Sequence, residues 1–152
     1  MDTFIGTKQI QAEPCKAWKQ SGEHCIGAEG YKVAYDDGYT SWSPKKQFED
    51  AYQNLSEGMS FGHAIVMAEA GAKIARAGWN GKGMWVIYNA ASRGETHPMF
   101  DGSVYKNHGV DECEILPHFD MYTVNADGRR AMLPGWLASQ TDMIAKDWRI
   151  VK

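Results

Sequence analysis

The stretch Ala75-Arg76-Ala77-Gly78-Trp79-Asn80-Gly81-Lys82-Gly83-Met84-Trp85 decides the predicted fold. Three glycines stand within six positions, and an Asn-Gly step lies between two tryptophans. Glycines and Asn-Gly steps supply the positive φ angles that a tight reversal of the chain needs. On both sides of this stretch, over 73–76 and 84–88, the side chains alternate as they do in strands. The sequence therefore predicts a strand, a glycine-rich turn and a second strand.

Length and composition favour a globular protein of one domain or two very small ones. The chain has 152 residues, of which 43% are apolar and 23% charged, so a packed core is possible. No apolar run approaches the roughly 20 residues that span a bilayer, and the start at Met1 lacks the features of a secretory leader. A net charge of −3 argues against binding to a nucleic acid polymer. We expect a cytoplasmic protein without a membrane partner.

The cysteines predict free thiols. Cys15, Cys25 and Cys113 are odd in number and have no C-x-x-C spacing, so neither a disulfide framework nor a structural zinc site is indicated. A metal site formed by Cys15, His24 and Cys25 is the weaker alternative. We expect no metal and no cofactor.

Residues 1–57 predict a small module. A strand is expected over 3–12 and a loop over 13–30. Asp36-Asp37-Gly38 predicts the turn of a β-hairpin. Ser43-Pro44 predicts a helix start, with serine as the N-cap and proline at the first helical position, and this helix is expected to end near Glu57-Gly58. The aromatic residues of the module are best explained as a small core, with a ligand platform as the alternative.

Residues 58–152 predict a second domain. A helix is capped by Ser60 and ends at Gly71. Strands are expected at the glycine-rich stretch and over 115–123, 129–132 and 146–151, with a long loop over 89–113; residues 136–143 look too short and too polar for a core helix. The predicted fold class is α+β: a small antiparallel sheet packed with one or two helices, plus the N-terminal hairpin and helix module.

The C-terminal two-thirds of the chain contains the groups that a nucleotide pocket needs. Rings stack on a base, amides and hydroxyls bond a base or ribose edge, and cations neutralise phosphate. The candidate rings are Trp79, Trp85 and Trp136; the candidate polar groups are Asn80, Ser139, Gln140, Thr141 and Asp142; the candidate cations are Arg76, Lys82, Arg129 and Arg130. The alternative is that Trp79 fills a core and the glycines only close a hairpin.

Enzyme motifs are not recognisable in the sequence. There is no G-x-S-x-G elbow, Walker loop, H-E-x-x-H or Rossmann fingerprint. His118 and Asp120 stand two apart in a predicted strand, so they share a face and form a possible acid–base pair with Ser139 or Cys113. The alternative for His118 is an ordinary buried, hydrogen-bonded histidine.

Two blocks resemble the phage Thoeris anti-defence protein two family. The first runs from Ser60-Phe61-Gly62-His63-Ala64 to the segment Lys73–Met84, which contains R-x-G-W-N-G-K-G-M. The second runs from Leu116-Pro117-His118-Phe119-Asp120-Met121 to the segment Pro134–Met143, with W-L-A-S-Q-T-D-M, and on to Asp147-Trp148. The similarity covers about residues 58–152, and blocks of this length in this order are specific.

The resemblance implies a phage sponge and not an enzyme. Such a protein binds cyclic ADP-ribose-type immune signals, and in some members cyclic dinucleotides at a separate site, without cleaving them. It thereby blocks Thoeris and also CBASS signalling in the cytoplasm of the infected bacterium. The family forms homo-oligomers, typically tetramers, with pockets between subunits. Carried over by motif, the ligand-binding residues would be Trp79, Asn80, Lys82, Met84, Trp136, Ser139, Thr141 and Asp142.

Two features depart from the family pattern and keep other functions open. Gly135 separates Pro134 from Trp136, where many members have proline directly before the tryptophan, so the ring position is in question. Residues 1–57 lie outside the family domain and resemble a module that recurs in phage proteins. The alternatives to the sponge are a phage protein–protein adaptor and a cyclic-nucleotide hydrolase that uses His118 and Asp120.

Overall fold

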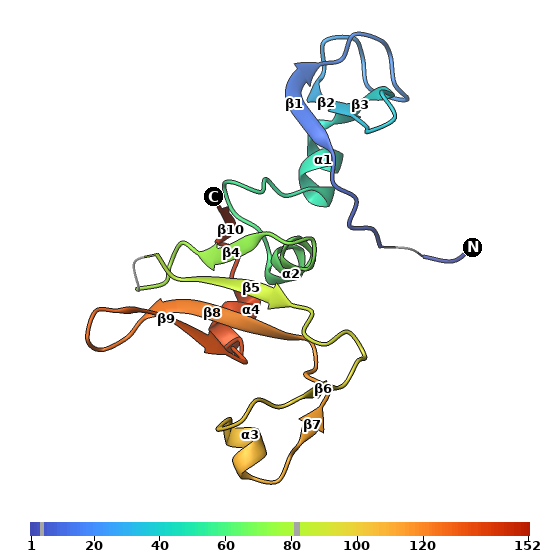
Figure 1. Ribbon diagram of the computed structural model, residues 1–152. Coiled ribbons are helices and arrows are strands. Elements are labelled where there is room, and N and C mark those ends of the chain that lie inside the picture. Colours follow the sequence, from blue (N-terminus) through green and yellow to red (C-terminus); the bar gives the residue numbers. More distant parts are fainter. Residues whose placement is uncertain (4, 81–82) are drawn as a thin grey trace. The chain divides into compact units, whose positions relative to one another are not determined.

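A computed structural model describes residues 1–3, 5–80 and 83–152, and these form two compact units, 1–54 and 55–152 (Figure 1). Each unit has a sheet of its own and at least one helix. The sheets are antiparallel, so the predicted α+β class is confirmed, including the hairpin and helix near the N-terminus.

The N-terminal unit is a three-stranded sheet followed by a short helix. Its elements are β1 (Gln11–Lys16), β2 (Glu29–Ala34), β3 (Thr40–Pro44) and α1 (Lys45–Ala51), with the strands in the order β1-β2-β3. The predicted hairpin at Asp36-Asp37-Gly38 is confirmed: it joins β2 to β3, and Gly38 has a φ of +83°. This left-handed angle explains the glycine.

Trp42 is the centre of the small N-terminal core. Its ring is 8% exposed, and its indole Nε1 donates to the carbonyl oxygen of Cys15 at 3.1 Å. A Cβ atom on Gly30 would overlap this ring, so the strand β2 needs glycine there. Beside the sheet, the rings of Tyr31, Phe48 and Tyr52 stack in sequence at centroid distances of 4.1 and 4.9 Å. Packing accounts for these aromatics.

Several predicted boundaries in this unit are wrong. The strand expected over 3–12 is instead β1, which begins at Gln11 because pairing with β2 defines it; Phe4 lies outside the described residues. Part of the expected loop over 13–30 therefore belongs to β1 and β2. Ser43 does not cap the helix, because it pairs with Tyr31 in the sheet. Pro44 is the N-cap, and the helix ends at Ala51.

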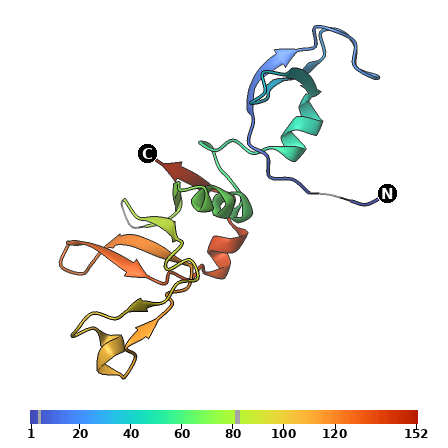
Figure 2. The same ribbon diagram turned by 45° about the vertical axis from the view of Figure 1, so that its right-hand side comes forward.

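The second unit is built on a five-stranded antiparallel sheet with the order β10-β4-β5-β8-β9. The strands are β4 (Lys73–Arg76), β5 (Trp85–Asn89), β8 (His118–Val124), β9 (Arg130–Pro134) and β10 (Trp148–Val151). Helix α2 (Phe61–Glu69) packs on β4, β5 and β10 and contacts α4 (Gln140–Ile144), as the green and orange helices of Figure 2 show.

Helix α2 has the predicted ends. The side chain of Ser60 accepts from the backbone N–H of His63, and Gly71 follows the helix with a φ of +95°. The helix buries Ala64 and Ala68 against the sheet. The core cluster of this unit consists of Met59, Ala64, Ala68, Ile74, Val86, Met121 and Trp148. Trp148 is fully buried, and backbone hydrogen bonds join it to Met59 in both directions.

The long loop expected over 89–113 has regular structure of its own. It contains β6 (His97–Pro98), α3 (Val104–Asn107) and β7 (Glu112–Cys113), and β6 pairs with β7. This excursion leaves the sheet at the end of β5 and returns at the start of β8 (Figure 1). At its neck, the backbone N–H of Ser92 donates to the carbonyl oxygen of Ile115 at 3.0 Å. Such two-residue strands leave almost no periodic signal in a sequence.

Two further expectations for the second unit change. The strand expected over 115–123 begins at His118, because pairing with β5 starts there. Residues 136–143, judged unsuited to a core helix, do contain most of helix α4, and its residue Asp142 is buried. A capping box, in which Ser139 and Asp142 bond each other's backbone and side chains, stabilises this short helix.

Candidate functional site

The structure brings together residues from two predicted blocks, Trp79 from the β4–β5 loop and Trp136 from the segment before α4. Their ring centroids lie 6.0 Å apart. Both rings also contact Trp148, at 5.4 and 6.1 Å, and all three pairs are edge-to-face with interplanar angles of 71° to 78°. Trp148 is fully buried, while Trp79 and Trp136 are half-buried. We call these three residues the tryptophan cluster.

The geometry of the tryptophan cluster limits how a base can bind. A base inserted between two rings needs them parallel, with roughly twice the 3.5–4.0 Å contact distance between their planes. Trp79 and Trp136 are instead inclined at 71° and touch each other. Within one chain, a base would therefore stack on the exposed part of one ring and not between the two.

Asp142 connects α4 to the tryptophan cluster. Its Oδ1 accepts hydrogen bonds from the indole Nε1 of Trp79 at 3.0 Å and from Nη1 of Arg76 at 2.9 Å. Its Oδ2 accepts from the backbone N–H and the hydroxyl of Ser139, at 3.0 and 2.6 Å. Both carboxylate oxygens thus have internal donors, and the residue is only 7% exposed. The predicted ligand contact of Asp142 is a structural contact in this arrangement.

These donors determine the ionisation of Asp142. Burial disfavours the charged carboxylate, but the hydrogen bonds from Ser139, Arg76 and Trp79 outweigh burial and lower the pKa from 3.8 to about 2. Asp142 is therefore a carboxylate at neutral pH, and it accepts from Trp79 as an anion.

Arg76, a candidate cation for phosphate, is bonded to carboxylates of its own chain. Its Nε donates to Oδ1 of Asp147 at 2.9 Å, while its Nη1 donates to Asp142. The side chain is 18% exposed. The other oxygen of Asp147 accepts from the backbone N–H of Gly78 at 2.7 Å, and hydrogen bonding from Arg76 helps to lower the pKa of Asp147. Arg76 is thus paired with two carboxylates of its own chain.

Sequence reasoning missed this network, although one signal was available. Arg76 shares the helix-facing side of β4 with Ile74, which is fully buried. A guanidinium on an apolar strand face needs a carboxylate partner, because an unpaired charge is costly to bury. Asp142 and Asp147, both in the second block, were the acids nearest to the predicted site.

The other predicted site residues differ in position. Met84 is half-buried and packs against the core cluster, while Asn80 is exposed. Thr141 is exposed, with its hydroxyl 2.9 Å from that of Ser139. Lys82 lies outside the described residues. Asn80 and Thr141 are therefore accessible, whereas Asp142 and Met84 support the site from within.

The segment from β9 to α4 carries several exposed apolar side chains. Leu137 is 88% exposed and Ile144 is 75% exposed, and Leu133 and Met143 are each about half exposed. Large apolar side chains gathered on a surface are typical of an interaction site.

His118 and Asp120 do share a face of β8, as their spacing predicts, but neither suggested nucleophile joins them. Nε2 of His118 lies 3.2 Å from Oδ1 of Asp120, and Asn89 donates to Oδ2 of Asp120 at 3.0 Å. Ser139 instead bonds Asp142 and Thr141. The Sγ of Cys113 lies 3.9 Å from the sulfur of Met99. The described residues therefore do not assemble the predicted acid–base and nucleophile set.

The other predicted ring and cations lie apart from the tryptophan cluster. Trp85 stacks on Tyr122, at a centroid distance of 4.6 Å and an angle of 7°. Trp85 and Tyr122 alternate along their strands with core residues, so they lie on the opposite face of the sheet. The guanidinium of Arg130 lies over Tyr122, and Arg129 pairs with Asp127 in an exposed turn.

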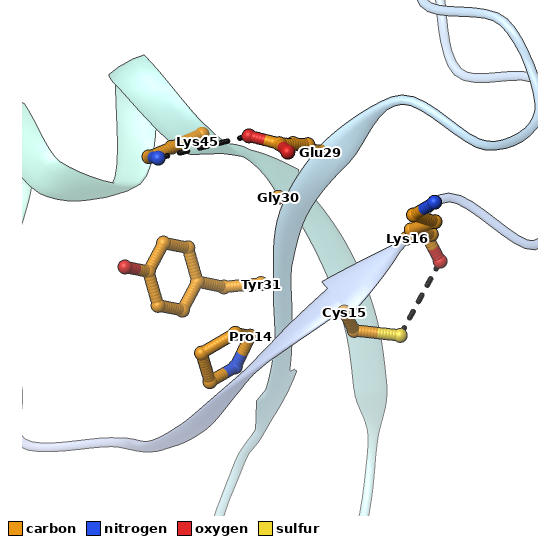
Figure 3. A pocket seen from close by; sticks show the side chains of 7 residues that line it. All are labelled: Pro14, Cys15, Lys16, Glu29, Gly30, Tyr31 and Lys45. Atoms are coloured by element: carbon orange, nitrogen blue, oxygen red, sulfur yellow. Dashed lines mark hydrogen bonds and ion pairs between the residues drawn. The ribbon is translucent and has the colours of Figure 1, made fainter.

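A hollow lies in the N-terminal unit, and the residues that line it are distant in sequence from the tryptophan cluster. It has a volume of about 380 Å³ and is lined by Pro14, Cys15, Lys16, Glu29, Gly30, Tyr31 and Lys45 (Figure 3). Nζ of Lys45 lies 3.6 Å from a carboxylate oxygen of Glu29, so this cation is already paired. Nothing in the lining selects a ligand.

The described residues show neither a metal site nor a membrane-spanning helix. They contain no group of three or more His, Cys, Asp or Glu side chains able to hold a metal ion. Cys15, Cys25 and Cys113 are free thiols. No helix in the described part of the chain is both long and apolar enough to cross a bilayer.

Comparison with known proteins places these features in a family. A family profile described as Tad2-like, a Thoeris anti-defense 2-like domain, matches residues 59–151. The match covers most of the chain, so the protein belongs to the Thoeris anti-defense 2-like family, and it is an anti-defence protein of the type that phages encode.

A curated relative agrees with the profile. The chain is 32% identical over 93 residues to the protein Thoeris anti-defense 2 of Bacillus phage SP01. The similarity covers 61% of this chain and 94% of that protein. It includes the glycine-rich loop, the tryptophan cluster and α4, all of which lie in the matched domain.

Proposed function

We propose that this protein binds and sequesters cyclic ADP-ribose-type immune signals, with cyclic dinucleotides as a second ligand class, without cleaving them. In doing so it blocks Thoeris signalling, and CBASS signalling as a further target, inside the infected bacterium. The observation that carries the proposal is the meeting of Trp79 and Trp136, from two family blocks, beside the accessible polar residues Asn80 and Thr141. Rings next to hydrogen-bonding groups suit a nucleotide.

Binding without cleavage is supported by the chemistry near the tryptophan cluster. Among the described residues, Arg76, Asp142 and Asp147 are ionisable side chains bonded to the cluster or to one another, and each is engaged in ion pairs within the chain. A carboxylate with a pKa of about 2 is a poor general base at neutral pH. These groups therefore hold the site in shape and do not promote proton transfer.

A sponge must bind tightly enough to outcompete its target. Nanomolar affinity corresponds to about −12 kcal/mol, which requires that most of the ligand surface be enclosed. Within one chain a base stacks on the exposed part of only one of the two half-buried rings, and this contact alone does not enclose a nucleotide. We therefore propose a homo-oligomer, typically a tetramer, in which a second copy covers the ligand. Leu137, next to Trp136 in the sequence, and Ile144 at the end of α4 are exposed apolar side chains suitable for contact with that copy.

Calorimetry of the full chain tests the binding proposal. Cyclic ADP-ribose, its isomers and a set of cyclic dinucleotides are titrated separately, and bound ligand is then released by denaturation and identified by mass spectrometry. We expect one class to bind with submicromolar affinity and to be recovered unchanged. Trp136→Ala should abolish binding, whereas Trp85→Ala, a matched change on the opposite sheet face, should not. A cleaved product would favour the hydrolase with His118 and Asp120.

A second candidate is a phage protein–protein adaptor, which the exposed apolar side chains Leu133, Leu137, Met143 and Ile144 favour. The adaptor would bind no nucleotide, and Trp79→Ala would affect it only through stability. Light scattering separates the two proposals further: Leu137→Asp should dissociate a homo-oligomer and weaken ligand binding together. Loss of a host partner, with unchanged mass in solution, would support the adaptor.

A further inference from the structure

Arg76 connects two segments of the candidate site that lie far apart in the sequence. It lies on β4, directly before the glycine-rich loop, and its guanidinium donates to Asp142 at the start of α4 and to Asp147 just before β10. Asp142 in turn accepts from the indole of Trp79, and Asp147 accepts from the backbone of Gly78. The guanidinium of Arg76 therefore holds both carboxylates that bond to the start of the β4–β5 loop.

We infer that Arg76 is a positioning residue for the ligand site: through Asp142 and Asp147 it fixes the Trp79 ring and Gly78 without touching the ligand. Only the ligand-binding part of this inference rests on the proposed function. The Arg76 side chain is only 18% exposed, and its Nε and Nη1 groups each donate to a carboxylate of the same chain.

Charge and geometry explain why arginine is needed here. The guanidinium is a planar fork whose separate N–H groups reach two carboxylates at once, whereas the lysine ammonium is a point charge. Asp142 and Asp147 would repel each other without a shared cation. An aspartate that loses its partner here would move toward solvent, and Trp79 would lose the acceptor for its indole N–H.

The close packing at Gly78 supports the second anchor. A Cβ atom there would lie 2.9 Å from Oδ2 of Asp147, closer than side chains normally approach. The backbone at the start of the loop thus sits directly against a carboxylate that Arg76 holds. A displacement of Asp147 therefore shifts the loop that carries Trp79 and Asn80.

The inference predicts effects that can be read without ligand. In the wild-type protein, the indole N–H of Trp79 and the amide N–H of Gly78 are each bonded to a carboxylate, so their NMR resonances report the two anchors separately. Arg76→Lys should shift or broaden both. Asp147→Asn, at a residue whose side chain is 35% exposed, should change the Gly78 amide and leave the Trp79 indole close to its wild-type position.

The ligand arm uses the cyclic ADP-ribose isomer that the wild-type chain binds most tightly in calorimetry. If the competent loop arrangement falls to about a tenth of the molecules, the apparent Kd of Arg76→Lys rises about tenfold. Arg129→Gln is the matched control, because Arg129 also pairs with an aspartate at 2.9 Å but is 77% exposed. We expect wild-type affinity and spectra for it.

The outcomes separate this inference from the proposed function. Unchanged indole and amide resonances in Arg76→Lys would overturn the positioning role, and so would weaker binding without any change at Trp79, which would indicate direct ligand contact. If the wild-type chain binds none of the isomers, the proposed function fails, while the two resonances still decide the role of Arg76. Should Arg76→Lys not fold, Asp147→Asn provides the same decision for the Gly78 anchor.

Discussion

The two faces of the five-stranded sheet each bury an aspartate, but they satisfy it differently. On the face covered by α2, Asp142 accepts hydrogen bonds from Arg76, Trp79 and Ser139, which together use both oxygens. On the opposite face, Asp120 accepts from Asn89 through Oδ2, while Oδ1 lies 3.2 Å from Nε2 of His118 without a partner in hydrogen-bond geometry among the described residues.

The aromatic residues differ between the same two faces. In the tryptophan cluster the rings meet edge-to-face, and Trp148 is fully buried. On the opposite face, Trp85 and Tyr122 form a parallel stacked pair, and Lys73 and Arg130 lie over their outer sides. The helix-covered face thus fixes one arrangement by many shared contacts, whereas the opposite face is held by pairs. The candidate site thus lies on the face of the sheet whose side chains share more contacts.

The largest expected effect comes from removing one aromatic ring from each face of the sheet. Trp148→Ala should lower the free energy of unfolding by about 3–5 kcal/mol, because it leaves a cavity in the core. Trp85→Ala should cost roughly 1–2 kcal/mol, through partial burial and the lost pair with Tyr122. Urea denaturation followed by circular dichroism measures both. Equal losses would show that the two faces are equally important for stability.

The second test neutralises each aspartate. Asp142→Asn breaks the buried pair with Arg76 and is expected to cost about 2–4 kcal/mol in the same urea experiment. Asp120→Asn should stay within about 1 kcal/mol of wild type, because Oδ1 of Asp120 makes no hydrogen bond that the amide would lose. A larger loss for Asp120→Asn would reverse the comparison.

Acid should lower the stability of the folded protein by protonating Asp142. Its pKa of about 2 in the folded protein lies below the ordinary value of 3.8, so the folded state favours the carboxylate. The resulting stability, roughly 2 kcal/mol, is present at neutral pH and is lost as the pH falls from about 4 towards 2. Urea midpoints measured at pH 7, 4 and 3 check this. Asp142→Asn, which lacks the titrating group, should show a smaller loss over that range.

The smallest effect is expected at an exposed ion pair. Arg129 and Asp127 lie 2.9 Å apart in the turn between β8 and β9, with side chains 77% and 66% exposed. Arg129→Gln should change the free energy of unfolding by less than about 0.5 kcal/mol, because water screens such pairs. Thermal melts at low and high salt measure it. A change above 1 kcal/mol would indicate that the turn has tertiary contacts.

Local signals predicted the parts of the fold that short-range chemistry determines. Ser60 and Gly71 marked the ends of α2, and Asp36-Asp37-Gly38 marked a hairpin, because caps and turns depend on neighbouring residues. The strand after the glycine-rich stretch was also found where expected. Strand β1 was misplaced, because its limits are set by pairing with β2 and not by its own pattern.

The candidate site was predictable only in part for the same reason. Family blocks indicated that Trp79 and Trp136 matter, and the structure shows that they touch. Their angle depends on long-range packing, and although the strand face of Arg76 indicates that it needs a carboxylate partner, no local pattern shows that the partners are Asp142 and Asp147. Asp142 was predicted as a ligand contact from its polar side chain and the family motif, and in this chain its oxygens also serve in helix capping and ion pairing.

The bridge between Met59 and Trp148 has a consequence for biosynthesis. The buried indole that completes the interior lies on β10, the last strand of this unit, while its backbone partner precedes α2. A ribosome must therefore release nearly all of this unit before the interior can close, and contacts between such distant positions slow folding. Premature stop codons or bulky fusions placed near β10 should thus yield unfolded, protease-sensitive chains even though most of the polypeptide is intact.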